Sequence, residues 1–153
     1  MPEQTFMEIA LEEARAAGAR GEVPVGCVIV SGAGGADGRV LARTANRVEE
    51  RSDPTAHAEM LAIRTALAEA GLPRLDGCDL YVTLEPCAMC AAAISHARLR
   101  RLYFGAYDPK SGGVDHGARV FDHATCHHKP EIIGGVLELK AAALLKAFFK
   151  ELR

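Results

Sequence analysis

Two short segments, far apart in the chain, carry side chains whose types could do chemistry together. The first reads His57-Ala58-Glu59, and the second reads Pro86-Cys87-Ala88-Met89-Cys90. Thiolates and imidazoles are common zinc ligands, and zinc prefers four of them in tetrahedral geometry. Structural zinc sites take all four ligands from the protein, whereas catalytic sites take three and keep one position for water. His57, Cys87 and Cys90 therefore predict a catalytic site with one zinc per chain.

Glu59 adds a carboxylate beside this ligand set. Zinc lowers the pKa of a bound water from about 15.7 to about 7, so that hydroxide is available at neutral pH. Attack on an sp² carbon that bears an amino group then requires a proton for the ring nitrogen and another for the leaving ammonia. One carboxylate can carry both, and we predict this role for Glu59.

Both segments are expected at the beginnings of helices. A helix from Pro86 to about 97 places Cys87 and Cys90 on one face, where its dipole favours thiolates. A second helix over 55–70, capped by Asp53 or Thr55 and ended by Gly71, carries His57 and Glu59. Because residues two apart on a helix point about 200° apart, His57 and Glu59 are expected to flank a pocket over the start of that helix.

The rest of the chain alternates between strand and helix patterns. Strands are predicted at 25–31, 39–45, 80–84, 102–104 and 132–133, with further helices at 5–19 and 139–152, the first capped by a Thr5–Glu8 capping box. A Gly-rich turn is expected at 31–38, and a helical turn at 118–123. The pattern predicts a three-layer α/β/α sandwich around a five-stranded mixed sheet, as one domain over 1–153. The connection between the strands at 102–104 and 132–133 is long enough for the fifth strand to run parallel to the fourth.

Composition limits the class of protein and its surroundings. Hydrophobic residues make up 49% and charged residues 25% of the chain, as in ordinary globular proteins. There is no signal-peptide pattern and no run of about 18 apolar residues, so no membrane contact is expected. An odd number of cysteines, 5, with a Cys-x-x-Cys pair favours a reducing compartment, and we predict the cytoplasm.

Charge alone does not identify a partner. The net charge of −2 argues against a strongly basic nucleic-acid binder. Residues 74–153 nevertheless carry 11 basic and 9 acidic side chains, a net of +2. This bias fits a local contact with an anion and fits a solvated surface equally well.

Other cysteines and histidines permit simpler interpretations. A Cys-x-x-Cys alone could be a redox pair, and Cys27 is expected to be a small core residue. The segment 116–128 is rich in histidine and also contains Cys126, but these residues lack regular ligand spacing. We predict no second metal site there.

The zinc motif and its surroundings resemble the cytidine/deoxycytidylate deaminase superfamily, and most closely its bacterial tRNA adenosine deaminase branch. The resemblance runs from about Glu8 to the C-terminus. The segments that carry it are Glu22–Gly26, Asp53-Pro54-Thr55-Ala56-His57-Ala58-Glu59, Tyr81–Cys90 and Phe104–Lys110. It implies a cytidine deaminase-like fold, a homodimer, zinc, and conversion of the wobble adenosine in a tRNA anticodon loop to inosine.

The resemblance also implies roles for particular residues. His57, Cys87 and Cys90 would bind zinc, and Glu59 would shuttle protons. Asn46 would read the flipped base, and the backbone N–H groups near Ala58 and Cys87 would donate to the zinc-bound oxygen. Contacts with the anticodon loop would come from Asp108, Lys110, Phe148 and Phe149. Taken alone, Asn46 and Asp108 also suit turns, and the two phenylalanines also suit a helix core.

Three alternatives remain open at this stage. A deaminase of free bases or nucleosides, of the guanine or cytosine type, would share all the zinc chemistry and differ only at the rim of the pocket. A non-catalytic zinc module would normally supply a fourth protein ligand. An RNA-binding protein with a vestigial site would not need an intact motif. Tyr107, where some relatives carry a basic residue, and the long turn at 32–38 depart from the family pattern.

Overall fold

A computed structural model describes residues 2–32 and 38–152, and within them five strands form one sheet. The strands are β1 (Gly26–Val30), β2 (Val40–Ala45), β3 (Asp79–Leu84), β4 (Arg101–Ala106) and β5 (Glu131–Ile133), in the order β2-β1-β3-β4-β5. β1 is antiparallel to β2 and β3, whereas β4 is parallel to β3 and β5. The mixed sheet and the parallel fifth strand are both confirmed.

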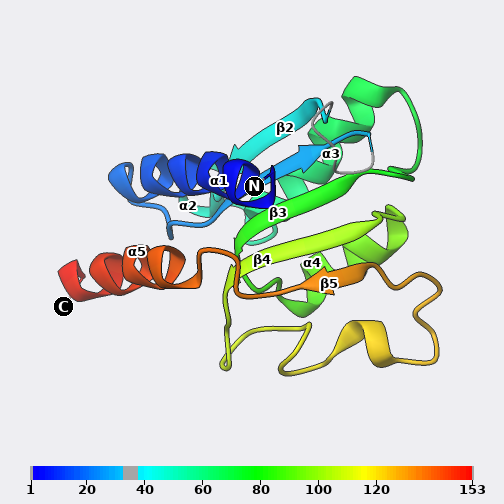
Figure 1. Cartoon of the computed structure of the whole chain (residues 1–153). Helices are drawn as coiled ribbons and strands as arrows, with labels where there is room; N and C mark the ends of the chain where they lie inside the picture. The colour runs from blue at the N-terminus through cyan, green and yellow to red at the C-terminus, as the bar shows by residue number, and fades with distance from the viewer. Residues whose placement is uncertain (1, 33–37, 153) are drawn as a thin grey trace.

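Helices cover both faces of this sheet. α1 (Pro2–Ala19) and α5 (Glu138–Glu151) lie against one face, and α3 (Ala58–Ala70) and α4 (Ala88–His96) lie against the other (Figure 1). β3 shows why: Leu80 and Val82 pack on the α3–α4 side, while Tyr81 between them packs on the α1–α5 side. Strand side chains alternate between faces, so one strand contributes to both cores of the predicted three-layer sandwich.

The first helix differs from the expected one. α1 begins at Pro2, so Thr5 lies inside the helix and the Thr5–Glu8 capping box is wrong. Proline suits the first helical position because that residue needs no N–H partner. Farther along, α1 lies so close to β1 that a Cβ on Gly26 would collide with the backbone of Ala10.

The helix that carries His57 begins later than predicted. The Asp53 carboxylate accepts hydrogen bonds from the Thr55 N–H at 2.8 Å and from the Thr55 hydroxyl at 2.7 Å. This turn keeps residues 53–56 out of helical conformation. α3 therefore starts at Ala58 with His57 as its N-cap, not Asp53 or Thr55, and ends at Gly71 in the left-handed conformation as expected.

Smaller elements complete the chain. α2 (Val48–Arg51) was not expected; the buried Glu22 carboxylate accepts the N–H groups of Glu49 and Glu50 at its first turn. The short helix η1 (Val120–Asp122) confirms the turn predicted within 118–123. Most of the Gly-rich turn predicted at 31–38 falls on 33–37, outside the described residues. Within the described part of the chain, no helix is both long and apolar enough to cross a membrane.

Candidate metal centre and its pocket

The start of α3 is bound to the end of β2 by hydrogen bonds on both sides of His57. The Thr44 hydroxyl donates to the Ala58 carbonyl at 2.7 Å, and the Arg47 N–H donates to the Ala56 carbonyl at 3.0 Å. The Ala58 N–H donates to Asn46 Oδ1 at 2.8 Å. These bonds fix the backbone from which the His57 imidazole projects.

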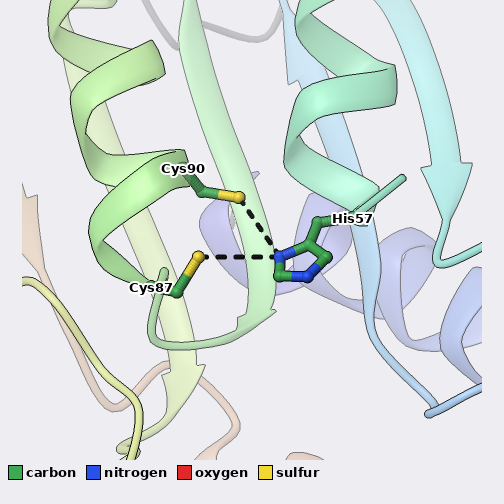
Figure 2. Close-up of side chains that lie close together, drawn as sticks. All are labelled: His57, Cys87 and Cys90. Atoms are coloured by element: carbon green, nitrogen blue, oxygen red, sulfur yellow. Dashed lines mark hydrogen bonds between the residues drawn. The ribbon is translucent and has the colours of Figure 1, made fainter. Parts of the chain in front are cut away.

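The two cysteines come from the other helix start. Cys87 is the N-cap of α4 in extended conformation, and Cys90 lies in the first turn. Pro86 thus precedes the helix, whereas the sequence had predicted that Pro86 is its first residue. Figure 2 shows both sulfur atoms pointing toward the imidazole of His57. Two helix N-termini, whose dipoles favour negative charge, meet at this point.

The three side chains fit a zinc ion. Each sulfur lies 3.6 Å from His57 Nδ1, and all three ligand atoms lie within 4.8 Å of one another. Tetrahedral bonds of about 2.0 Å to nitrogen and about 2.3 Å to sulfur would place those atoms about 3.6 Å apart. The expected ligand set is therefore brought together with spacing suited to one zinc, and no fourth protein ligand joins this group within residues 2–32 and 38–152.

The ligand side chains also alter one another's proton affinity. A hydrogen bond from the Cys90 thiol lowers the pKa of Cys87 to about 4, and the same bond, with burial, raises the pKa of the Cys90 thiol. Hydrogen bonding with Cys87 raises the pKa of His57. Zinc requires thiolates and a neutral imidazole, so its binding releases protons from this cluster.

Glu59 lies in the first turn of α3 and is buried. Burial, which disfavours the charged carboxylate, raises the pKa of Glu59 to about 7. His57 at the N-cap and Glu59 two residues later line one cavity, which confirms the expected pocket over the helix start.

That cavity has a volume of about 530 Å³. It brings together most of the residues predicted for the site, which are His57, Glu59, Cys87, Asn46, Asp108, Phe148 and Phe149. Lys110 is exposed outside the cavity lining. Phe148 is half-buried and Phe149 is exposed, and their rings meet edge to face at 5.4 Å. The two rings thus border the cavity and are not part of a closed core.

Two groups that the resemblance assigned to substrate contacts make hydrogen bonds within the protein. The Ala58 N–H, expected to donate to a metal-bound oxygen, donates to Asn46. Asp108 Oδ1 accepts from the N–H groups of Lys110 and Ser111 at 3.2 and 3.0 Å, so it forms the turn that sequence alone also allowed.

Two buried carboxylates in the cavity lining were missed from sequence. Glu22 and Glu85 are each 2% exposed and both line the cavity. Hydrogen bonds from the backbone of Asp108 and from His116 outweigh the effect of burial and hold the pKa of Glu85 below its usual value. Glu85 stands two residues from a metal ligand, as Glu59 does, and this spacing was the available signal.

The remaining cysteines and histidines lie elsewhere. Cys27 is buried in the core, as predicted. His123, Cys126 and His127 line a separate cavity of about 310 Å³ beside Ser95 and His96 of α4. The only group of three ligand atoms close enough for a metal within residues 2–32 and 38–152 is the one already described.

Comparison with known proteins places this geometry in a family. The family described as the cytidine and deoxycytidylate deaminase zinc-binding region matches residues 1–106. The tRNA-specific adenosine deaminase of Agrobacterium fabrum (strain C58) is 56% identical and covers 100% of this chain and 98% of its own length.

Two solved structures extend the comparison. A structure from work on A-to-I editing by tRNA:A34 deaminases at the wobble position of transfer RNA is 57% identical with a TM-score of 0.87, over 92% of this chain and 99% of that one. A guanine deaminase from Bacillus subtilis is 40% identical with a TM-score of 0.62, over 67% of this chain and 63% of that one. The chain belongs to the cytidine and deoxycytidylate deaminase family, whose zinc-binding region contains the cluster of His57, Cys87 and Cys90.

Proposed function

We propose that this protein converts the wobble adenosine of a tRNA anticodon loop to inosine by zinc-dependent hydrolysis. The observation that carries the proposal is the single cavity that joins the metal ligands His57 and Cys87 and the carboxylate of Glu59 to Asn46 and to the phenylalanines of α5. The names of relatives aligned over nearly the full chain supply the substrate class. One end of the cavity can thus do the chemistry while the other holds a nucleotide.

In the proposed reaction, water adds its oxygen to C6 of adenine, and the amino group leaves as ammonia. His57, Cys87 and Cys90 would hold one zinc ion, which lowers the pKa of a bound water to about 7. Glu59 accepts the first proton from water and delivers it to the ring nitrogen. The same carboxylate then carries the second proton to the leaving amine, so a single group serves both transfers.

Asn46 is proposed to face the base through its NH₂ group. Its Oδ1 accepts from the Ala58 N–H at 2.8 Å, and this bond sets the orientation of the amide. The NH₂ end is then available as a donor to an acceptor atom on the purine. Asn46 would in this way connect the start of α3, and hence His57, with the position of the base.

The rim of the cavity is proposed to bind nucleotides next to the target base. Asp108 and the α5 residues Phe148 and Phe149 line the cavity, and the exposed Lys110 stands two residues after Asp108. Unpaired bases of an RNA loop can be turned out of the stack for a few kcal/mol or less. A loop nucleotide is therefore a natural substrate for a pocket reached from such a rim.

We also infer that the 153 residues form one deaminase domain that acts as a homodimer in the cytoplasm. The resemblance in the zinc motif supports the dimer. The cysteine content, with five free thiols in the structure, supports a reducing compartment.

A deaminase of a free base is the second candidate. The similarity to the Bacillus subtilis guanine deaminase favours it, since that protein shares 40% identity over 67% of this chain. The two candidate functions would use the same metal ligands. They differ in whether the rim of the cavity binds nucleotides next to the target base.

Product analysis separates the two candidates. Purified protein is incubated with matched anticodon stem-loops that carry adenosine or cytidine at the wobble position, and in parallel with free adenosine, cytidine and guanine. The proposal predicts inosine from the adenosine stem-loop and little product from the other substrates, because truncated substrates lose binding energy used in the transition state. Rapid turnover of free guanine with an unreacted adenosine stem-loop would replace it with the second candidate.

A further inference from the structure

A buried carboxylate directly before the zinc motif holds a distant loop. Glu85 Oε1 accepts from the Asp108 N–H at 3.1 Å and lies 2.8 Å from His116 Nδ1. Glu85 Oε2 accepts from three consecutive N–H groups, those of Val114, Asp115 and His116, at 3.2, 3.0 and 3.1 Å. Five donors from residues 108–116 therefore converge on one side chain.

The same loop also contacts the start of α4. The Gly113 N–H donates to the Pro86 carbonyl at 2.7 Å, and a Cβ on Gly113 would lie 2.5 Å from the Ala88 nitrogen. A Cβ on Gly112 would collide with the Glu85 carboxylate itself. The loop is thus packed against the backbone that carries Cys87, with no space for a side chain between them.

We propose that Glu85 is a positioning residue, which fixes the 108–117 loop against the metal centre and so sets where Asp108 and Lys110 stand at the rim. Asp108 is bonded to Glu85 through its own N–H, and its Oδ1 then accepts the N–H of Lys110. A chain of two hydrogen bonds thus leads from the zinc motif to Lys110. In assigning Lys110 to RNA, the inference rests on the proposed function.

Glu85→Gln tests the inference with almost no change in side-chain volume. Whichever way the glutamine amide turns, its NH₂ group must face at least one of the backbone N–H groups that the carboxylate accepts. The matched control is Asp79→Asn, since Asp79 is a buried carboxylate at the other end of β3, paired with Arg100 at 3.0 and 2.6 Å. All variants are compared as zinc-loaded proteins.

Hydrogen exchange is the first measurement. We expect Glu85→Gln to speed exchange at the amides of residues 108 and 114–116 by about tenfold or more, because local opening becomes easier. Asp79→Asn should destabilise the protein without a selective change in that loop. Unchanged exchange at 108–116 in Glu85→Gln would overturn the inference, whether or not RNA is the substrate.

A double-mutant cycle on kcat/KM for the adenosine stem-loop is the second measurement. Lys110→Ala should lower kcat/KM by about five- to tenfold in the wild-type background and by less than about twofold in Glu85→Gln, since a displaced lysine has little left to lose. In Asp79→Asn the full effect of Lys110→Ala should remain.

The outcomes separate this inference from the proposed function. A wild type that is inert on the stem-loop defeats the proposed function, while hydrogen exchange still decides whether Glu85 holds the loop. An active wild type in which the Lys110→Ala and Glu85→Gln effects are additive, or in which Lys110→Ala has no effect, overturns the inference.

Discussion

The metal wall of the cavity consists of side chains at the first residues of two helices, whereas the rim comes from a loop and the last helix. The metal wall is His57, Glu59 and Cys87, which line the cavity, together with the third ligand Cys90; Glu59 and Cys90 are buried. The rim is Asp108, Phe148 and Phe149, which line the cavity, together with the exposed Lys110, two residues after Asp108; Phe149 is 46% exposed. The proposed chemistry thus lies at two helix starts, and the proposed substrate recognition lies on a loop and a helix that come later in the chain.

Removing a metal ligand should produce the largest effect and should affect the metal wall as a whole. We expect Cys87→Ala to lose zinc, nearly all activity and thermal stability together, because zinc binding is coupled to folding. Elemental analysis and a melting curve measure this. Cys78→Ala is the control, because Cys78 is a buried cysteine outside the ligand set. A Cys87→Ala protein with one zinc per chain would show that the ligand set is wrong.

Glu59→Gln should affect the chemistry of the metal wall and nothing else. Zinc content and fold should be kept, while turnover falls by about 10⁴-fold or more, since one group serves two proton transfers. Turnover is measured next to zinc analysis on the same sample. If more than roughly a tenth of the wild-type rate remained, Glu59 could not be the shuttle.

Asn46 stands between the metal wall and the rim, and two substitutions separate its two contacts. Asn46→Asp keeps an oxygen for the Ala58 N–H but loses the NH₂ donor, whereas Asn46→Ala loses both. If the NH₂ group contacts the base, both variants should lower kcat/KM by about 10- to 100-fold, the usual effect of one lost hydrogen bond to a buried partner. Near-normal activity of Asn46→Asp alone would mean that Asn46 only anchors α3.

The smallest effect is expected at the rim. Lys110→Ala should weaken stem-loop binding several-fold and should make binding less dependent on salt, because each phosphate contact contributes a slope of about −0.7 for single-stranded nucleic acid. Binding titrations at several salt concentrations measure both quantities. A wild-type affinity that does not change with salt would argue for a free-base substrate.

Sequence alone predicted the metal ligands because their residue types are distinctive, although His57 lies 30 and 33 residues before the two cysteines. The ligand types and the three-residue spacing of Cys87 and Cys90 can be read directly, and a proline before them indicates a helix start. Two errors at these helix starts also have local causes. The Asp53–Thr55 turn delays α3 to Ala58, and α4 starts after Pro86 rather than at it.

What sequence missed depends on contacts between distant residues. α2 is capped by the Glu22 carboxylate, which comes from 27 and 28 residues earlier in the chain. The donors to Glu85 come from 23 to 31 residues later, so the pattern around Pro86 does not reveal them. The family resemblance assigned Asn46 to a contact with the base. Its hydrogen bond with the Ala58 N–H depends on how the end of β2 lies against the start of α3, which the sequence does not show.

Single-turnover kinetics on the adenosine stem-loop tests most directly whether the metal wall carries the chemistry and the rim carries the recognition of RNA. Wild type, Glu59→Gln and Lys110→Ala are compared across a range of protein concentrations. The division predicts that Glu59→Gln lowers the limiting rate with little change in the half-saturating concentration, and that Lys110→Ala does the reverse. A Lys110→Ala variant whose limiting rate falls as far as that of Glu59→Gln would contradict it.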